Sequence, residues 1–252
     1  MARNVVITGA GEVGRAIADG FLERGDNVHV CDVLAESVEA ATGVHERLRA
    51  SVADVGSDED VKRLFDEVGE WMPSVDVLVN GVGIGGPRAA TEDTDPDDWG
   101  KVLNVNLVGM VRCIRHVAPG MKASAGGSIV NFSSCSSQTA PPNRSVYVAS
   151  KAAVDGLTRT IARELGPHGV TCNAILPGAI ANERLAQIVE TKAAARGQAP
   201  DEYLEEALRY VSLRRMVEVR EIADYVVFLC SDQARAITGQ LLRIDGNFEW
   251  ED

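Results

Sequence analysis

The sequence predicts a doubly wound α/β fold, in which one parallel sheet carries helices on both faces. Short runs rich in β-branched residues alternate with longer helical patterns from one end of the chain to the other, an order that is typical of parallel sheets. A length of 252 residues suits one large domain and is too short for two comfortable ones. We therefore expect a single domain that spans residues 1–252.

The individual elements follow from hydrophobic periodicity and from start signals. The runs with strand character are residues 5–8, 28–31, 75–80, 128–132, 170–175 and 241–245. The runs with helical character are residues 13–24, 58–71, 97–122, 146–165, 182–210 and 219–229. Asp95 and Pro96 precede the third helix as an N-cap and a first-turn proline. The charged segment 182–212 interrupts the regular alternation, and we interpret it as a lid over a substrate.

Composition excludes several classes of function. The formal net charge of -12 disfavours partners such as nucleic acid or an anionic membrane surface. No apolar run approaches the ~18 residues of a membrane span, and we expect a cytoplasmic protein. The five cysteines are scattered without a Cys-x-x-Cys pair and the four histidines are isolated, so we expect neither a disulfide framework nor a metal site.

A glycine-rich turn follows the first strand. Its residues Gly9, Gly11 and Gly14 fit the pattern G-x-G-x-x-G, with Glu12 and Val13 between them. The first glycine permits a tight turn, the second a close approach of backbone to pyrophosphate, and the third a close helix–strand contact. The phosphate would lie on the N-terminus of the next helix. A tight turn without a ligand is the alternative, but the context favours a dinucleotide-binding Rossmann fold.

An acidic residue ends the second strand. Asp32 lies 23 residues after Gly9, where a carboxylate binds the ribose hydroxyls of adenosine and repels a 2′-phosphate. No Arg or Lys follows it closely, and Glu12 adds negative charge that we place on the same adenosine side. The cofactor that we predict is therefore NAD rather than NADP. A structural strand-end turn is the alternative for Asp32.

Tyr147 and Lys151 are four residues apart, in Tyr-Val-Ala-Ser-Lys, and Ser134 lies upstream of them. Side chains four apart on a helix are neighbours, so an ammonium at 151 favours ionisation of a phenol at 147. Such a tyrosine would serve as a base near neutral pH. Each residue alone has an ordinary structural explanation, but their combination with a nucleotide turn points to an enzyme.

With these motifs, the chain resembles the short-chain dehydrogenase/reductase family over essentially its whole length. The resemblance implies a catalytic serine, tyrosine and lysine at Ser134, Tyr147 and Lys151. It also implies that the backbone carbonyl of Asn106, in Asn-Val-Asn-Leu, holds a proton-relay water. Residues 237–246 are similar to the closing strand of the family, which implies a homo-oligomer, either a tetramer or a dimer.

The same resemblance implies further cofactor ligands. Asp54 and Val55 are similar to the acidic step that binds adenine, and Asn80 and Gly81 to the start of the family's Asn-Asn-Ala-Gly segment. The nicotinamide carboxamide would lie against the turn Pro177, Gly178 and Ile180, with Asn182 where the family often has threonine. Tyr147 and Lys151 would contact the cofactor as well.

Two departures from the family pattern affect the cofactor site. The family's turn is Thr-Gly-x-x-x-Gly-x-Gly, and residues 8–14 are one residue shorter. Gly81 replaces an asparagine, which removes a side-chain hydrogen-bonding group. The shortened turn is the best support for a nucleotide-binding regulator without turnover.

We expect an NAD-dependent oxidoreductase that transfers a hydride between nicotinamide and a small secondary alcohol or ketone, of the sugar, polyol or hydroxyacyl type. Ser134 would stabilise charge on the substrate oxygen, and Tyr147 would be the general acid or base. The alternatives are a 3-oxoacyl-type carbonyl reductase using NADPH and the regulator without turnover. Four arginines near the expected pocket are candidates to pair with a substrate carboxylate or phosphate: Arg88, Arg144, Arg184 and Arg196.

Overall fold

Seven parallel strands form the central sheet of the protein, seen in a computed structural model that describes residues 2–249. Their order across the sheet is β3-β2-β1-β4-β5-β6-β9. The bounds are β1 (Asn4–Thr8), β2 (Asn27–Asp32), β3 (Leu48–Val52), β4 (Val77–Asn80), β5 (Gly127–Phe132), β6 (Val170–Pro177) and β9 (Leu241–Ile244). Strands are added on one side of β1 up to β3 and on the other side from β4 onward, so the strand order reverses between β1 and β4. Ligands of such sheets bind at the carboxyl ends of the strands beside this switch point.

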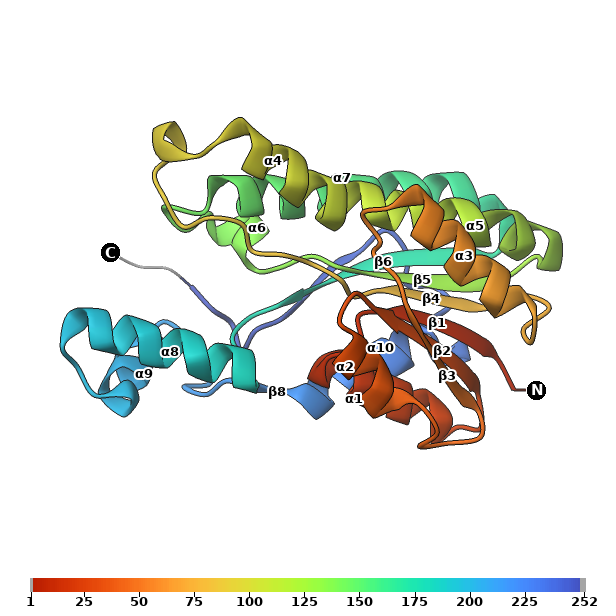
Figure 1. The fold of residues 1–252 in the computed structure, drawn as a ribbon, viewed down its shortest axis with the longest axis horizontal. Helices are drawn as coiled ribbons and strands as arrows, with labels where there is room; N and C mark the ends of the chain where they lie inside the picture. The colour runs from red at the N-terminus through yellow and green to blue at the C-terminus, as the bar shows by residue number, and fades with distance from the viewer. Residues whose placement is uncertain (1, 250–252) are drawn as a thin grey trace.

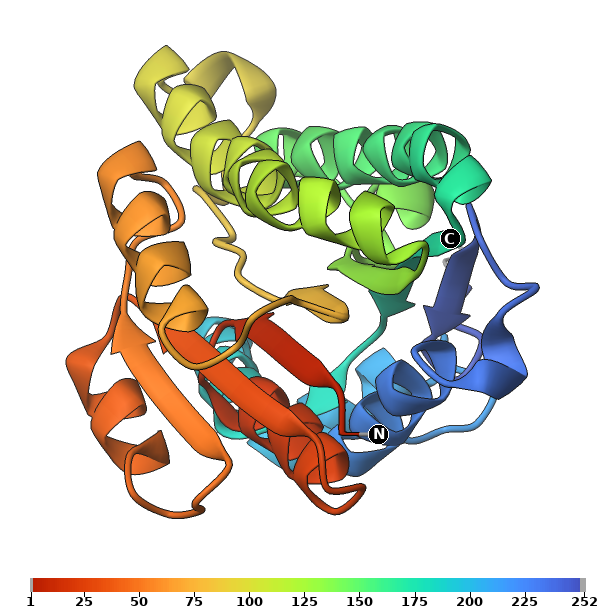
Figure 2. The ribbon, with the colours of Figure 1, turned by 90° about the vertical axis from the view of Figure 1, so that its right-hand side faces the viewer.

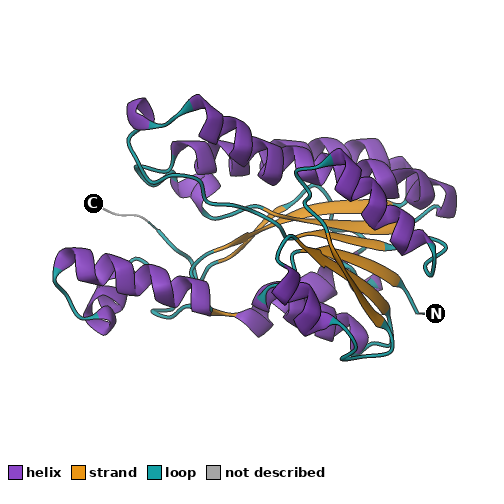
Figure 3. Cartoon of the chain, viewed as in Figure 1, coloured by secondary structure: helices purple, strands orange, loops and turns teal. Residues whose placement is uncertain are grey.

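Helices cover both faces of the sheet (Figures 1 and 3). One layer holds α1 (Glu12–Leu22), α2 (Ala35–Ala41) and α10 (Val219–Leu229), and the other holds α3 (Asp58–Gly69), α4 (Pro96–Leu103), α5 (Gly109–Ser124) and α7 (Ser145–Leu165). Each layer has its own apolar core. Phe21, Ile17 and Ile222 pack beneath the sheet, whereas Leu64, Ile114 and Met121 pack above it. The predicted doubly wound α/β fold is confirmed.

A π-helical turn interrupts the long helix that was expected over residues 97–122. The chain runs from α4 through a π-helix at Asn104–Val108 directly into α5. The start of α4 agrees with its sequence signal, because the Asp95 side chain accepts a hydrogen bond from the Asp97 amide and Pro96 is the first helical residue. π-Turns within helices often mark functional sites, and Asn106 lies in the middle of this one.

The segment 182–212 forms two helices instead of the single helix expected. These are α8 (Glu183–Arg196) and α9 (Pro200–Leu208), and Gly197 ends α8 with a left-handed φ of 65°. A two-stranded sheet of β7 (Ile180–Ala181) and β8 (Val217–Glu218) joins the two ends of this segment. The helices extend away from the body of the molecule (Figure 1), and in the turned view they lie behind the α1 layer (Figure 2).

Several other elements were not predicted, among them strand β3 and helix α2. Edge strand β3 reads Leu-Arg-Ala-Ser-Val and has exposed positions, so it lacks a continuous β-branched run. Helix α2 has only seven residues and buries only Val38 and Ala41. The remaining short elements are α6 (Ser136–Thr139) and the 3₁₀ turns Thr91–Asp93, Gly166–His168 and Asp232–Ala234.

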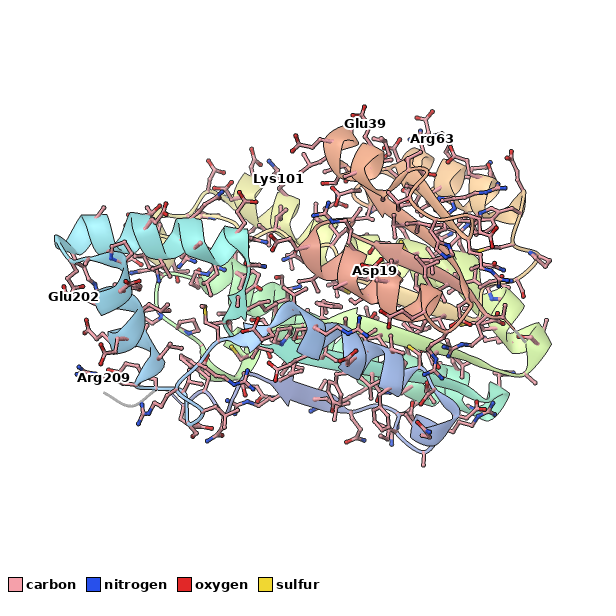
Figure 4. All side chains as sticks on the ribbon, turned by 90° about the horizontal axis from the view of Figure 1, so that it is seen from below. Asp19, Glu39, Arg63, Lys101, Glu202 and Arg209 are labelled. Atoms are coloured by element: carbon pink, nitrogen blue, oxygen red, sulfur yellow. The ribbon has the colours of Figure 1, made fainter. Side chains whose placement is uncertain are left out.

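Charged side chains cover the outer faces of the helices. Asp19, Arg63 and Lys101 mark three helices of the body, and Glu202 on α9 marks the far end of the extension (Figure 4). In the part of the chain that the structure describes, no helix is both long and apolar enough to cross a bilayer.

Candidate active site

The carboxyl ends of five neighbouring strands bring the sequence-predicted residues to one edge of the sheet. Asp32 and Asn80 are the last residues of β2 and β4, and Pro177 is the last of β6. Gly9 follows β1 directly, and Ser134 lies two residues beyond β5. Because parallel strands end at the same edge, residues that are far apart in the sequence lie together there.

The glycine-rich turn uses each of its glycines differently. Gly9 has a left-handed φ of 95°, and its carbonyl oxygen lies only 1.8 Å from where a Cβ on Gly14 would be. Gly14 therefore allows α1 to pack against the turn, and any side chain there collides with backbone. Gly11 differs, because no atom lies within 4 Å of a Cβ built on it. The open side of the turn is thus at Gly11.

Helix α1 begins at this open side without a side-chain cap. Within residues 2–249, no acceptor is found for the amides of Glu12 and Val13, which are among the first N–H groups that a helix leaves free. Free amides at a helix N-terminus are an anion site. The turn and the helix start therefore have the geometry that a pyrophosphate requires.

Glu12 does not lie where the sequence suggested. Its Oε2 accepts a hydrogen bond of 3.3 Å from the amide of Glu183, at the start of α8. The side chain thus points toward the 182–212 segment, whereas the sequence placed it on the adenosine side, and its contact with the cofactor stays a prediction. The N-terminal turn of α8 attracts a carboxylate, which explains this direction.

Asp32 and Asp54 both bind backbone amides beside the adenosine side. The carboxylate of Asp32 accepts from Ala10 (2.8 Å) and Leu34 (3.0 Å), so it also fixes the glycine-rich turn. Asp54 accepts from the amide of Gly56 at 2.7 Å. Val55, beside it, is buried against Gly109, where a Cβ would lie 2.9 Å from a Val55 methyl group. The cofactor contacts of these three residues stay predictions.

Asn80 is the last residue of β4, and Gly81 follows it. The Asn80 Nδ2 donates to Asn131 Oδ1 at 2.9 Å, whereas its buried Oδ1 has no partner among the described residues. The Gly81 amide donates to the carbonyl and the hydroxyl of Thr8, and a Cβ at 81 would lie 2.7 Å from the Thr8 carbonyl oxygen. Glycine at 81 therefore allows β1 and β4 to pack closely. The sequence had indicated only that a side-chain hydrogen-bonding group is lost there.

Lys151 is buried in the first half of α7. Its Nζ donates to the carbonyl of Phe132 at 2.7 Å and lies 5.8 Å from the centre of the Tyr147 ring. Burial lowers the pKa of Lys151 to about 8, while the nearby Asp155 carboxylate acts in the opposite direction and Arg184 adds to the lowering. The ammonium and the phenol are neighbours, as their spacing predicted, and the ammonium is held in place by the strand end.

Ser134 and Tyr147 complete the predicted catalytic group. Ser134 is nearly buried, and its Oγ accepts from the amide of Ser136 at 3.1 Å, which leaves its proton available to donate. The guanidinium of Arg144 stacks on the Tyr147 ring, 4.3 Å from its centre. Arg144, the residue before α7, is thus nearer to the centre of the Tyr147 ring than Lys151 is.

Asn106 is fully buried in the π-helical turn. Its side chain pairs with both backbone groups of Ile84, accepting from the amide at 2.8 Å and donating to the carbonyl at 2.9 Å. It also donates to Ser150 Oγ, one turn from Tyr147. Asn106 therefore fixes the glycine-rich segment after β4 against α7, a side-chain role that the sequence did not indicate.

The turn after β6 is held by its neighbours. The carbonyl of Pro177 accepts from the amide of Cys135, and a Cβ on Gly178 would lie 2.6 Å from the Cβ of Asp245. Ile180 begins the small sheet, paired with Val217. Asn182 caps α8, its Oδ1 accepting from Leu185 at 2.9 Å. The cap engages the side-chain oxygen of Asn182 and leaves the side-chain Nδ2 free to donate.

Asp155 and Cys135 also lie at the site, and only the first of them was missed by the sequence analysis. Asp155, four residues after Lys151 on α7, is buried and accepts from Ser137 Oγ at 2.7 Å, and its Oδ1 has no partner in the described part of the chain. The i, i+4 spacing to Lys151 was the available signal. Cys135 follows Ser134 directly, and this position suggested a thiol that is open to oxidation or alkylation. Burial raises its pKa to about 11, so the thiol form dominates at neutral pH.

The residues present fit a nicotinamide dinucleotide. The open face at Gly11 and the free amides of α1 suit the pyrophosphate, and the orphaned Asn80 Oδ1 marks an unfilled acceptor along the same strand edge. In the described residues, no group of three or more His, Cys, Asp or Glu side chains is arranged to hold a metal ion.

Comparisons with known proteins agree with this geometry. The family described as enoyl-(acyl carrier protein) reductase matches residues 9–248. The 3-oxoacyl-acyl-carrier-protein reductase FabG of Staphylococcus epidermidis is 35% identical over 254 residues, covering 98% of both chains. NAD⁺-bound xylitol dehydrogenase superposes with a TM-score of 0.89 at 31% identity, covering 96% of this chain and 97% of that one.

L-sorbose reductase of Gluconobacter frateurii, complexed with NADPH and L-sorbose, superposes with a TM-score of 0.92 at 26% identity, covering 98% of this chain and 96% of that one. The relatives thus include proteins named as dehydrogenases and as reductases. The chain belongs to the short-chain dehydrogenase/reductase family and is an oxidoreductase that acts on hydroxyl or carbonyl groups.

Proposed function

We propose that the protein is an NAD-dependent oxidoreductase that interconverts a small secondary alcohol and its ketone, with Tyr147 as the general acid or base. The observation that carries the proposal is the cluster of Tyr147, Lys151 and Ser134 beside the open glycine-rich turn. When bound, the nicotinamide accepts or supplies the hydride.

Each residue of the cluster has a distinct part in the proposal. Ser134 donates a hydrogen bond to the substrate oxygen, and Tyr147 removes the hydroxyl proton in oxidation or returns it in reduction. Lys151 stabilises the phenolate by its charge and binds the nicotinamide ribose. The side chain of Asn106 holds the segment after β4 in place through Ile84. The backbone carbonyl of Asn106 would bind a water that relays protons between Lys151 and solvent.

NAD is proposed as the cofactor because of Asp32. Its carboxylate is fixed at the end of β2 by two amides and would repel a 2′-phosphate on the adenosine ribose. The remaining ligands in the proposal are Gly9, Gly11, Val13, Gly14, Asp54, Val55, Asn80, Gly81, Pro177, Gly178, Ile180 and Asn182. Glu12 is retained only as a neighbour of the turn, since it binds α8.

A specific observation favours one alternative substrate class. The FabG relative at 35% identity is a 3-oxoacyl-acyl-carrier-protein reductase by name, so a 3-oxoacyl-type reductase that uses NADPH is the second candidate. We also propose a homo-oligomer. Strand β9 forms one edge of the sheet with four half-buried residues, and a partner strand would cover that edge.

The decisive experiment follows absorbance of the reduced nicotinamide with NAD and NADP, across secondary alcohols and ketones. Tyr147→Phe should lower kcat by about 10²- to 10⁴-fold, the usual contribution of a general acid or base. Turnover that survives this substitution contradicts the role of Tyr147. Asp32→Ala should reduce the preference for NAD, and equal use of NADP by the wild-type protein contradicts the assignment of Asp32.

A further inference from the structure

Three arginines gather beside the proposed catalytic residues. Arg144 precedes α7 directly, Arg184 lies in the first turn of α8, and Arg88 lies in the loop after β4. The three segments are far apart in the sequence and come from both layers of the molecule. We call Arg88, Arg144 and Arg184 the arginine trio.

Gly85 shows how close two of the three lie. A Cβ built on Gly85 would be 3.3 Å from the Nη1 of Arg144 and 3.7 Å from an Nη of Arg184. Both guanidiniums therefore face the same point of the chain, and the lack of a side chain at 85 leaves room for them. Arg88 is near enough that its charge, together with burial and Arg184, lowers the pKa of Arg144.

The arginine trio has no counter-ion within residues 2–249. No ion pair and no side-chain hydrogen bond to these guanidiniums occurs in that range, although the chain has 37 acidic residues and a net charge of -12. Other arginines of the same region are neutralised: Arg196 pairs with Glu206 at 3.7 Å and Arg215 with Glu221 at 2.7 Å. Like charges held together without a partner repel one another, so an anion would stabilise this arrangement.

The arginine trio also lies at a defined place relative to the proposed chemistry. Arg144 stacks on the Tyr147 ring at 4.3 Å, and a Cβ on Gly83 would lie 3.1 Å from Lys151 Nζ. Gly83 and Gly85 are two residues apart, and the chain spans at most about 7 Å over that interval. An anionic group held at Gly85 is therefore only a few bonds from an oxygen held beside Tyr147.

We propose that the arginine trio is a subsite for an anionic end of the substrate, a carboxylate, sulfonate or phosphate. The inference rests on the proposed function and narrows its substrate to a short secondary alcohol or ketone with an acidic terminus. Guanidiniums bind such oxyanions in bidentate fashion. Arg184 comes from the α8 side and Arg144 from the α7 side, so the anion would also hold α8 against the body.

The pyrophosphate of the cofactor is the other anion to consider. Its proposed place is the start of α1, at Gly11, whereas the arginine trio surrounds Gly85 beside Tyr147. The two sources are separated by measuring the Kd for NAD alongside substrate specificity. Loss of a substrate subsite changes substrate specificity, whereas loss of a cofactor subsite weakens the binding of NAD.

The test compares 3-hydroxybutanoate with its methyl ester, which have the same carbon skeleton and differ in charge. With NAD, the wild-type protein should have the higher kcat/KM for the carboxylate. Arg184→Gln and Arg144→Gln should each lower the carboxylate-to-ester ratio by about 10-fold or more, the effect of losing a charged hydrogen bond, and Arg184→Lys should restore part of it. Arg196→Gln, on the same helix but paired with Glu206, is the matched control and should leave the ratio unchanged.

Each outcome separates the subsite from the proposed function. A ratio near one in the wild-type protein, or a preference that survives both glutamine variants, overturns the subsite, and a weakened Kd for NAD with an unchanged ratio assigns it to the cofactor instead. If no alcohol is oxidised, calorimetry with butanesulfonate and butanol decides. If butanesulfonate binds, butanol does not, and Arg184→Gln abolishes the binding, the subsite is supported although the proposed function fails. If butanesulfonate does not bind, both are rejected.

Discussion

Lys151 is a buried ammonium whose charge depends on two neighbours of opposite sign. Burial lowers its pKa to about 8, Asp155 opposes this effect, and Arg184 adds to it. The protonated form donates to the Phe132 carbonyl and would donate to the cofactor ribose as well. A neutral amine has fewer donors and no charge, so binding of an anionic dinucleotide should weaken as pH rises through the pKa of Lys151.

Asp155→Asn is expected to lower the pH at which the binding of NAD weakens. Loss of the carboxylate lowers the pKa of Lys151 below about 8, so the Kd for NAD should begin to rise at a lower pH than in the wild-type protein. Arg184→Gln removes a cation and should shift the rise to higher pH. Titration of NAD by fluorescence over a range of pH measures both shifts.

The control for this experiment is Asp66→Asn, which removes an exposed carboxylate paired with Lys62 on α3. Its profile should coincide with that of the wild-type protein. Profiles of Asp155→Asn and Arg184→Gln that move in the same direction would contradict the assignment of the transition to Lys151.

At the scale of elements, hydrophobic periodicity was enough to predict the apolar strands and the longer helices. Helix α10 was predicted with its observed bounds, and Asp95 and Pro96 predicted the start of α4. Edge strand β3 was missed because exposed residues interrupt its buried ones, so it has no continuous apolar run. The break at Gly197 was missed because both flanking segments have helical composition and one glycine does not decide between a kink and an end.

The candidate site was predictable where its residues belong to a local sequence motif. Ser134, Tyr147, Lys151 and the glycine-rich turn are such motifs, and the structure brings them to one edge of the sheet. Contacts between distant segments were not predictable in this way. Glu12 binds α8, Arg144 stacks on Tyr147, and Asn106 pairs with Ile84, and each contact depends on loop paths that no periodicity describes.

The glycine-rich turn offers a matched pair of substitutions. Gly14→Ala places a methyl group 1.8 Å from the Gly9 carbonyl oxygen, so the turn and α1 must separate, and we expect a clear loss of thermal stability. Gly11→Ala meets no atom within 4 Å and should fold with a Tm close to that of the wild-type protein. Its methyl group would nevertheless occupy the side on which we propose that the pyrophosphate binds.

Gly11→Ala is therefore expected to raise the Kd for NAD by about 10-fold or more, which corresponds to ~1.4 kcal/mol of binding free energy. Differential scanning fluorimetry and NAD titration on both variants provide the measurements. If Gly11→Ala binds NAD as tightly as the wild-type protein, the pyrophosphate does not approach this residue, and the shortened turn holds the cofactor in another way.

At the scale of the whole molecule, a buried polar network joins the sheet edge to the α3 layer. The Nε1–H of Trp71 donates to His29 Nδ1 at 3.2 Å. His29 Nε2 must then carry the proton and donate to Ser51 Oγ at 2.7 Å, and Ser51 donates in turn to Glu67. A Ser, a His and a Glu also occur in series in catalytic sites. Here both ring nitrogens of His29 are already bonded, to Trp71 and to Ser51, and the ring is buried. We therefore assign the network to stabilisation of the fold.

This network predicts that the whole fold loses stability in mild acid. Burial lowers the pKa of His29 to about 4, while its unfolded value is about 6.5. Between these values the unfolded chain binds more protons, so the free energy of unfolding should fall as pH falls through that window and stay constant above it. Urea unfolding at about pH 7 and about pH 5 should show a loss on the order of 2 kcal/mol from this residue. His29→Gln should be less stable near neutrality but should lose less stability on acidification, and a variant with the full wild-type dependence would assign the acid sensitivity to other groups.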